Sequence, residues 1–148
     1  TLGVQNASFV AQAVDWIPES LFQIVTAAFR HRGLSFVRIL QRCPEFVGGM
    51  FEPWVHDPQR MLMLTHENGL KVSPALQKIY RNQIVHDPAD INRAREIASS
   101  EDPIPVGILY HNPQVPCYED LRGAGKLRTT DTIRSSLEAE FDKFTVWP

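Results

Sequence analysis

The chain has 148 residues, of which 43% are hydrophobic and 22% are charged, and its formal net charge is -2. This is the composition of one globular domain with room for a subdomain, and the scattered Lys and Arg residues exclude the basic surface that nucleic acids or anionic membranes require. No stretch reaches the roughly 18 apolar residues of a membrane span, and no secretory signal is recognisable, so we expect a cytoplasmic protein.

The first 40 residues predict a strand, a helix and a second strand. Residues 7–11 are a short apolar run typical of a buried strand. Pro18 suits the first position of a helix, the next apolar residues recur at helical spacing, and Gly33 suits a left-handed cap, so we expect a helix over residues 18–32. A β-branched, apolar strand over residues 34–40 follows, and this succession predicts a parallel crossover.

The chain then changes character and, we expect, leaves the sheet. Gly48, Gly49, Pro53 and Pro58 interrupt the segment that follows Cys43-Pro44, so residues 44–57 read as a connector. Asp57, Ser73 and Asp87 each precede a proline, a pattern that predicts three helix starts, the second helix running to about Arg81.

The last third of the chain predicts one strand and one helix. Residues 104–110 form a second buried strand candidate, in which Pro105 favours the first position or an edge. Residues 113–126 read as a loop. Beyond them, Thr130 and Asp131 are capping candidates for an amphipathic helix, whose apolar residues are Ile133, Leu137, Phe141 and Phe144.

Cys43 is the residue that most needs an explanation. It follows a strand, and open α/β sheets carry their functional groups at the carboxyl ends of strands. A free cysteine often fills space in a core, whereas an iron–sulfur cluster needs about four thiolates, of which this segment supplies one. Cys117 lies far away in sequence, so the two cysteines form neither a disulfide framework nor a self-sufficient metal site.

The other motifs of catalysis and metal binding are missing from the sequence. The five histidines are at least ten residues apart, which removes the spacing that puts two of them on one helix face. His31 reads as a helix C-terminal cation, and His56 and His86 precede the predicted caps. The chain contains no phosphate-binding loop and no nucleophile elbow.

An ordered set of short segments resembles one family, the beta subunits of 2-oxoacid:ferredoxin oxidoreductases. The segments Asn6-Ala7-Ser8-Phe9-Val10-Ala11, His31-Arg32-Gly33, Ser35-Phe36-Val37 and Gln41-Arg42-Cys43-Pro44-Glu45-Phe46 look like the end of its thiamine-diphosphate-binding domain. Residues 63–71 and 104–110 resemble its C-terminal extension. The resemblance therefore spans most of the chain and covers the C-terminal portion of such a protein.

The resemblance implies an enzyme that oxidatively decarboxylates a 2-oxoacid to an acyl-CoA and passes electrons through iron–sulfur clusters to ferredoxin. Its cofactors would be thiamine diphosphate, Mg²⁺ and a 4Fe-4S cluster, and its partners the alpha subunit or domain and ferredoxin, in an oligomer. Cys43 falls where the family places the last of the thiolates that hold the cluster. It is the only residue of this chain that the resemblance assigns to a cofactor.

The departures from the family pattern predict a fragment. The family's Gly-Asp-Gly diphosphate grip and the first three cysteines are absent, and the sequence opens at Thr1, so we expect this piece alone to be inactive. We expect an α/β fold in which residues 1–47 close a parallel-sheet domain and residues 48–148 form a mostly helical extension. The length of the extension favours 2-oxoglutarate slightly over pyruvate as substrate.

Two other interpretations stay open at this point. A non-catalytic α/β interaction module would carry Cys43 enclosed by apolar side chains, whereas a cluster ligand would lie near the surface. A small nucleotide-binding α/β protein is the other, although the chain lacks a loop that could cradle phosphates.

Overall fold

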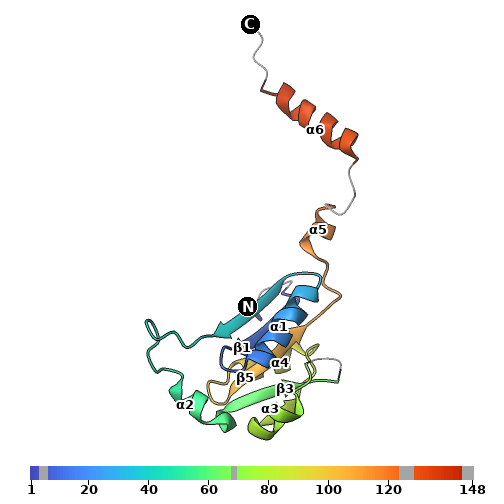
Figure 1. The fold of residues 1–148 in the computed structure, drawn as a ribbon. Helices are drawn as coiled ribbons and strands as arrows, with labels where there is room; N and C mark the ends of the chain where they lie inside the picture. The colour runs from blue at the N-terminus through green and yellow to red at the C-terminus, as the bar shows by residue number, and fades with distance from the viewer. Residues whose placement is uncertain (4–6, 68–69, 124–128, 145–148) are drawn as a thin grey trace. The chain divides into compact units, whose positions relative to one another are not determined.

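The computed structural model describes residues 1–3, 7–67, 70–123 and 129–144, which form two compact units. Residues 1–117 make up the first unit and residues 118–148 the second. A five-stranded sheet with the strand order β2-β1-β5-β3-β4 is the centre of the first unit (Figure 1). The α/β class predicted from the sequence is confirmed.

The predicted strand, helix and strand at the start of the chain are present. Strand β1 (Phe9–Val14) is buried at every residue, helix α1 (Pro18–Arg30) follows, and β2 (Ser35–Leu40) pairs with β1 in parallel from Phe9 opposite Ser35 to Val14 opposite Leu40. Helix α1 ends two residues earlier than predicted because His31 has extended backbone angles, with φ -69° and ψ 131°. Gly33 then takes a φ of +143°, which side chains rarely allow.

The connector after β2 contains more structure than the sequence predicted. It includes the short helix α2 (Glu52–His56), and it leads into a 3-10 turn, η1 (Pro58–Arg60). The side chain of Asp57 caps that turn by accepting a hydrogen bond from the Gln59 amide. The predicted helix start at Asp57 is therefore confirmed, although the helix is a single 3-10 turn.

The chain leaves the sheet after β2, as expected, but it then returns with two strands that the sequence did not predict. Strands β3 (Met61–Thr65) and β4 (Gln83–Val85) pair in parallel, and β3 also pairs in parallel with β5 (Ile104–His111). Strand β5 pairs with β1 in the antiparallel direction, so three of the four strand pairings are parallel.

The prediction of β5 was right, but the expectation of an edge strand or a first position for Pro105 was wrong. Strand β5 lies between β1 and β3, and Pro105 is its second residue. A central position is tolerated because the pairing with β1 begins only at Gly107, so no ladder bond to β1 needs an amide of residue 105. The Pro105 carbonyl instead accepts a hydrogen bond from the Gln12 side chain at 2.9 Å.

Helices cover both faces of the sheet. One core cluster contains Ile24 of α1 and Phe9 of β1, and Leu76 of α3 (Pro74–Ile79) packs against it. The other cluster lies under α4 (Ile91–Ala98), through Ala94 and Ile97. Ser73 caps α3 as predicted, but α4 is capped by Asp90 rather than by Asp87, so the predicted third helix start was three residues early.

The described residues of the second unit, 118–123 and 129–144, contain two helices. Helix α5 (Tyr118–Leu121) lies in the span predicted as a loop, which extends into residues outside the described ranges. Helix α6 (Thr130–Asp142) is confirmed, with Thr129 as the cap instead of Thr130. Its apolar residues Ile133, Leu137 and Phe141 are exposed. None of the helices in the described parts of the chain is long and apolar enough to cross a membrane.

Candidate functional site

Cys43 lies just beyond the carboxyl ends of β1 and β2. These two strands are parallel neighbours, so Asp15 and Cys43, which follow them, emerge at the same end of the sheet. The Asp15 amide donates to the Leu40 carbonyl at 3.0 Å, which continues the pairing one step past β1. The Cys43 amide donates to the carbonyl of Gln41 at 3.1 Å, so the backbone turns tightly where the thiol is attached.

The carboxylate of Asp15 holds Arg42, the residue directly before Cys43, at two points. Its Oδ2 accepts from the Arg42 backbone amide at 3.1 Å, and its Oδ1 accepts from Arg42 Nε at 2.9 Å. The guanidinium also lies 5.9 Å from the centre of the Trp16 ring. Both the backbone and the side chain of Arg42 are thus fixed to the end of β1.

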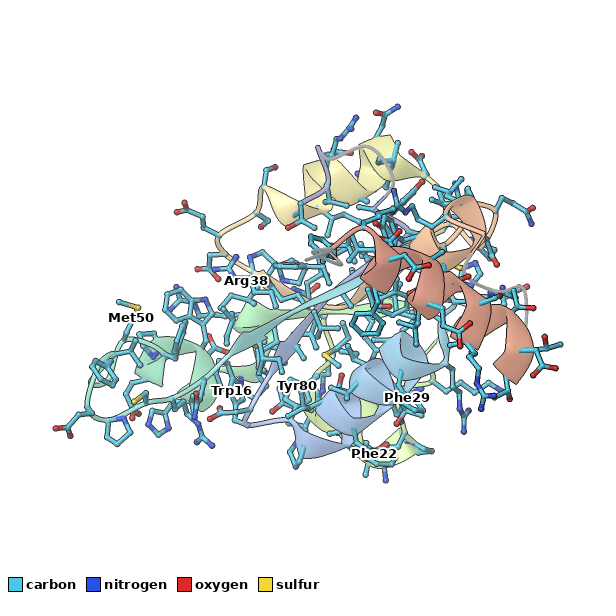
Figure 2. All side chains as sticks on the ribbon, turned by 90° about the horizontal axis from the view of Figure 1, so that it is seen from above. Trp16, Phe22, Phe29, Arg38, Met50 and Tyr80 are labelled. Atoms are coloured by element: carbon cyan, nitrogen blue, oxygen red, sulfur yellow. The ribbon has the colours of Figure 1, made fainter. Side chains whose placement is uncertain are left out.

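Aromatic side chains attach the connector to this end of the sheet. Trp16 contacts Phe51 with ring centres 5.7 Å apart, and Phe51 contacts Trp54 at 6.2 Å. Tyr80 packs into the same core cluster, where burial raises its pKa and the nearby Arg42 charge partly opposes that rise. In Figure 2, Met50 lies at the outer part of the connector, while Trp16 lies closer to the sheet.

The connector and the strand ends enclose an open pocket of about 340 Å³. Asp15, Arg42 and Cys43 form part of its wall, and Met50, Phe51 and Glu52 of the connector line it too. Cys43 is partly exposed on this wall, whereas Cys117 is 7% exposed. Neither cysteine forms a disulfide. Of the two cysteines, only Cys43 is placed to meet a group that enters from outside.

A single thiol cannot build a metal centre by itself. Among the residues that the structure describes, no group of three or more His, Cys, Asp or Glu side chains could hold a metal ion. A soft thiolate on the wall of an open pocket fits a cluster whose other ligands come from elsewhere. Cys43 stays a predicted ligand, since its role depends on those other groups.

The opposite end of the sheet holds a histidine network that the sequence did not predict. His31 Nε2 lies 2.8 Å from Ser8 Oγ, and His31 Nδ1 lies 3.2 Å from His111 Nε2. Partial burial lowers the pKa of His31, with a further contribution from the charge of His111, and burial also lowers the pKa of His111. His31 lies at the C-terminal end of α1 as expected, but the lowering of its pKa favours the neutral ring over the expected cation.

His56 and His86, which precede predicted helix caps, have partners outside the His31–His111 network. His56 forms an ion pair with Glu52 at 2.6 Å on the surface of α2 when it is protonated. His86 is 3% exposed and donates through Nε2 to the Leu109 carbonyl at 2.7 Å, while its Nδ1 is buried without a hydrogen-bond partner. No sequence spacing could have shown these contacts, since His86 and Leu109 are 23 residues apart.

Comparison with known proteins gives one consistent family. The family model for the C-terminal region of the pyruvate ferredoxin oxidoreductase beta subunit matches residues 76–125. The subunit beta of 2-oxoacid:ferredoxin oxidoreductase 2 from Aeropyrum pernix is 26% identical over 118 residues, which cover 76% of this chain and 34% of that protein. The chain is thus related to the beta subunits of 2-oxoacid:ferredoxin oxidoreductases. The resemblance seen in the sequence is confirmed.

Further relatives among the 2-oxoacid:ferredoxin oxidoreductases agree. The 2-oxoglutarate oxidoreductase subunit KorB from Mycobacterium tuberculosis is 43% identical over 47 residues, or 32% of this chain and 13% of that protein. The fold is similar to that of a 2-oxoglutarate:ferredoxin oxidoreductase from Magnetococcus marinus, with a TM-score of 0.52 and 21% identity over 88% of this chain and 40% of that one. That structure has 2-oxoglutarate, coenzyme A and succinyl-CoA bound.

The chain matches only part of the length of its curated relatives. It spans about a third of the length of two curated relatives, the subunit beta proteins from Aeropyrum pernix and Sulfolobus sp, at 34% of each. The strands β1 to β5 and the pocket at Cys43 therefore correspond to only part of those proteins.

Proposed function

We propose that the chain forms the C-terminal part of the beta subunit of a 2-oxoacid:ferredoxin oxidoreductase, an enzyme that oxidatively decarboxylates a 2-oxoacid in the presence of CoA to an acyl-CoA and CO₂, with ferredoxin as the electron acceptor. The names of the relatives support this reaction class, and two of them, from M. tuberculosis and Magnetococcus marinus, support 2-oxoglutarate over pyruvate as the substrate. The residues that would bind thiamine diphosphate and Mg²⁺ would lie outside this chain, as would most ligands of the cluster.

The role of this chain in that enzyme is to offer the thiolate of Cys43 to a 4Fe-4S cluster. When bound, such a cluster accepts electrons one at a time and passes them on toward ferredoxin. The observation that carries this proposal is the position of Cys43, which is partly exposed on the wall of an open pocket at the carboxyl end of β2. The alternative, an interaction module with a core cysteine, would need that thiol enclosed.

The apolar surface of the first unit supports a place inside a larger assembly. Strand β2 is an edge of the sheet, and its residues Phe36 and Ile39 are 44% and 46% exposed. Phe22 and Phe29 of α1 are 73% and 89% exposed, and Figure 2 shows both on α1. Exposed apolar residues near the unpaired outer edge of a sheet are typical of surfaces that another polypeptide covers. This surface supports the proposed alpha-subunit partner and the proposed oligomer; a cytoplasmic location remains part of the proposal.

The test uses the complete enzyme, co-expressed with its partner subunits, and compares the wild type with Cys43→Ser. We expect Cys43→Ser to lose iron and visible absorbance, because a serine oxygen is a poor substitute for a thiolate in an iron–sulfur cluster. Cys117→Ser is the matched control, since it removes a buried thiol far along the chain from Cys43, and it should keep both signals. Unchanged iron content and spectrum in Cys43→Ser would defeat the ligand assignment.

A further inference from the structure

Two aspartate–arginine pairs in this chain have almost the same design, but only one of them lies at the pocket. Arg42 pairs with Asp15 and lies over Trp16, and Arg60 pairs with Asp102 and lies 4.6 Å from the Trp54 ring centre. Asp15 and Arg42 line the pocket beside Cys43, whereas Arg60 and Asp102 are not among its lining residues. The difference in place suggests a difference in role.

The contacts of Asp15 fix the backbone directly before Cys43. The Arg42 amide is one residue before Cys43, and a hydrogen bond to Asp15 Oδ2 fixes it at 3.1 Å. The Cys43 amide is bonded in turn to Gln41, and the Cys43 carbonyl accepts from the Val47 amide at 3.0 Å. With the backbone fixed on both sides of Cys43, little freedom is left to its side chain except rotation about χ1.

We propose that Asp15 is a positioning residue for Cys43, and that the Asp15–Arg42 pair sets the reduction potential of the cluster that Cys43 would bind. This inference rests on the proposed function. The carboxylate and the guanidinium stand on the same pocket wall as the thiol and carry opposite charges. Their charges nearly cancel, so in the intact protein the pair would add little net electrostatic potential at the cluster.

Removal of Asp15 and removal of Arg42 are predicted to shift the reduction potential of the cluster in opposite directions. The potentials of iron–sulfur clusters depend on nearby charge, on hydrogen bonds and on solvent exposure. Arg42→Gln leaves the Asp15 carboxylate without its partner, which disfavours an added electron and makes the potential more negative. Asp15→Asn leaves the guanidinium without its partner, which favours an added electron and makes the potential more positive. Asp15→Asn also weakens the hold on residue 42, so its iron content should fall below that of Arg42→Gln.

A purely structural role would give a different pattern. If the pair only stabilised the fold, both variants would lose iron together, with no opposite shifts in potential. Arg42→Lys further distinguishes an electrostatic role from a purely structural one, because lysine keeps the positive charge but cannot reproduce the planar donors of the guanidinium. We expect the potential of Arg42→Lys to stay close to that of the wild type.

The experiment is a redox titration of the complete enzyme, followed by visible absorbance and electron paramagnetic resonance. The signal to follow is the one that Cys43→Ser removes. We expect a negative shift for Arg42→Gln, a positive shift for Asp15→Asn and little change for Arg42→Lys. Arg60→Gln and Asp102→Asn change the same charges at the other pair and should leave the potential as in the wild type. Shifts of the same sign in the two Asp15 and Arg42 variants, no shift, or equal shifts in the controls would overturn the inference.

The outcomes separate this inference from the proposed function. If Cys43→Ser keeps its iron, the ligand assignment fails and the inference fails with it. If Cys43→Ser loses its iron while Arg42→Gln and Asp15→Asn keep the wild-type potential, only the inference fails. Circular dichroism identifies a variant that does not fold. If Asp15→Asn does not fold, the comparison of Arg42→Gln with Arg60→Gln is sufficient. A more negative reduction potential in Arg42→Gln alone would support the inference, and equal potentials would overturn it.

Discussion

The two ends of the sheet use ionisable side chains in opposite ways. Strands β1 and β5 are antiparallel, so the end that carries Asp15 and Cys43 is opposite the end where β5 finishes at His111. The Cys43 end keeps a charged pair on the wall of an open pocket. The histidine end keeps two partly covered rings within hydrogen-bond distance of each other, and their lowered pKa values favour the neutral form. Under the proposed function, the charged end faces a bound group, whereas the histidine end joins elements of the fold to one another.

The hydrogen bonds of the histidine end define a consistent neutral arrangement. The Ser8 hydroxyl donates to the Leu34 carbonyl at 3.2 Å, so it accepts from His31 Nε2, and His31 Nδ1 accepts in turn from His111 Nε2. A proton added to His31 Nδ1 would set two N–H groups against each other. The network therefore ties the end of α1 to the start of β1 and to the end of β5 only while the rings are neutral.

The largest expected difference between the two ends concerns Phe9. Its side chain is 1% exposed, and its ring centre lies 5.6 Å from those of both His31 and His111. We expect Phe9→Ala to lower the free energy of unfolding by about 3–5 kcal/mol, because it leaves a cavity and releases both rings. At the other end, Phe51→Ala should cost less because Phe51 is only partly buried. Urea unfolding of both variants checks this, and equal losses would contradict the contrast.

The next largest effect is a loss of stability in mild acid. An unfolded histidine has a pKa near 6.5, and the pKa values of His31 and His111 are lowered in the folded state. Between these lowered pKa values and about pH 6.5, the unfolded chain therefore binds more protons than the folded chain. The free energy of unfolding rises with pH over that range. The contribution of these two residues is complete above about pH 6.5 and is lost as the pH falls through their lowered folded-state pKa values.

The double variant H31Q/H111Q tests that effect. Glutamine has an amide that can still donate to Ser8, but it does not titrate, so we expect the pH dependence below about 6.5 to flatten. Urea midpoints between about pH 5 and 8 measure the slope. If the double variant keeps the wild-type slope, the network does not govern the acid sensitivity.

Local signals explain why the start of the fold could be predicted from the sequence. Pro18 and Gly33 mark the two ends of the helical region, and the β-branched run before Leu40 identifies β2. The position of Cys43 at a strand end followed from the same signals. These features depend on neighbouring residues, and a single sequence contains that information.

Contacts between distant residues explain what could not be predicted. Strand β3 is the run Met-Leu-Met-Leu-Thr, which lacks β-branched residues before its last position and becomes a strand by pairing with β5. Strand β4 has three residues and depends on β3. His31 and His111 are 80 residues apart, and Asp15 and Arg42 are 27 apart. No spacing rule of helices or strands connects such pairs, so only the topology of the sheet brings them together.

The start of α4 offers the smallest and most local test, at the histidine end. Asp90 Oδ1 accepts from the amides of Asn92 and Arg93 at 2.9 and 3.0 Å. Asp87, the cap predicted from the sequence, accepts from the Ala89 amide at 3.0 Å in a turn outside the helix, and its Oδ1 lies 3.9 Å from His66 Nε2. We expect Asp90→Ala to lower the free energy of unfolding by about 1 kcal/mol, the usual cost of losing a cap, and Asp90→Ser to restore most of it.

Asp87→Ala should cost less than Asp90→Ala, because it removes a turn bond and a long, largely exposed ion pair with His66 and leaves the first turn of α4 intact. Thermal unfolding of the three variants gives their order. A larger loss for Asp87→Ala would mean that α4 begins at Pro88, as the sequence predicted. The Pro88 carbonyl, which accepts from the His111 amide at 2.8 Å, would then belong to the helix, and the histidine end would be held by a longer α4.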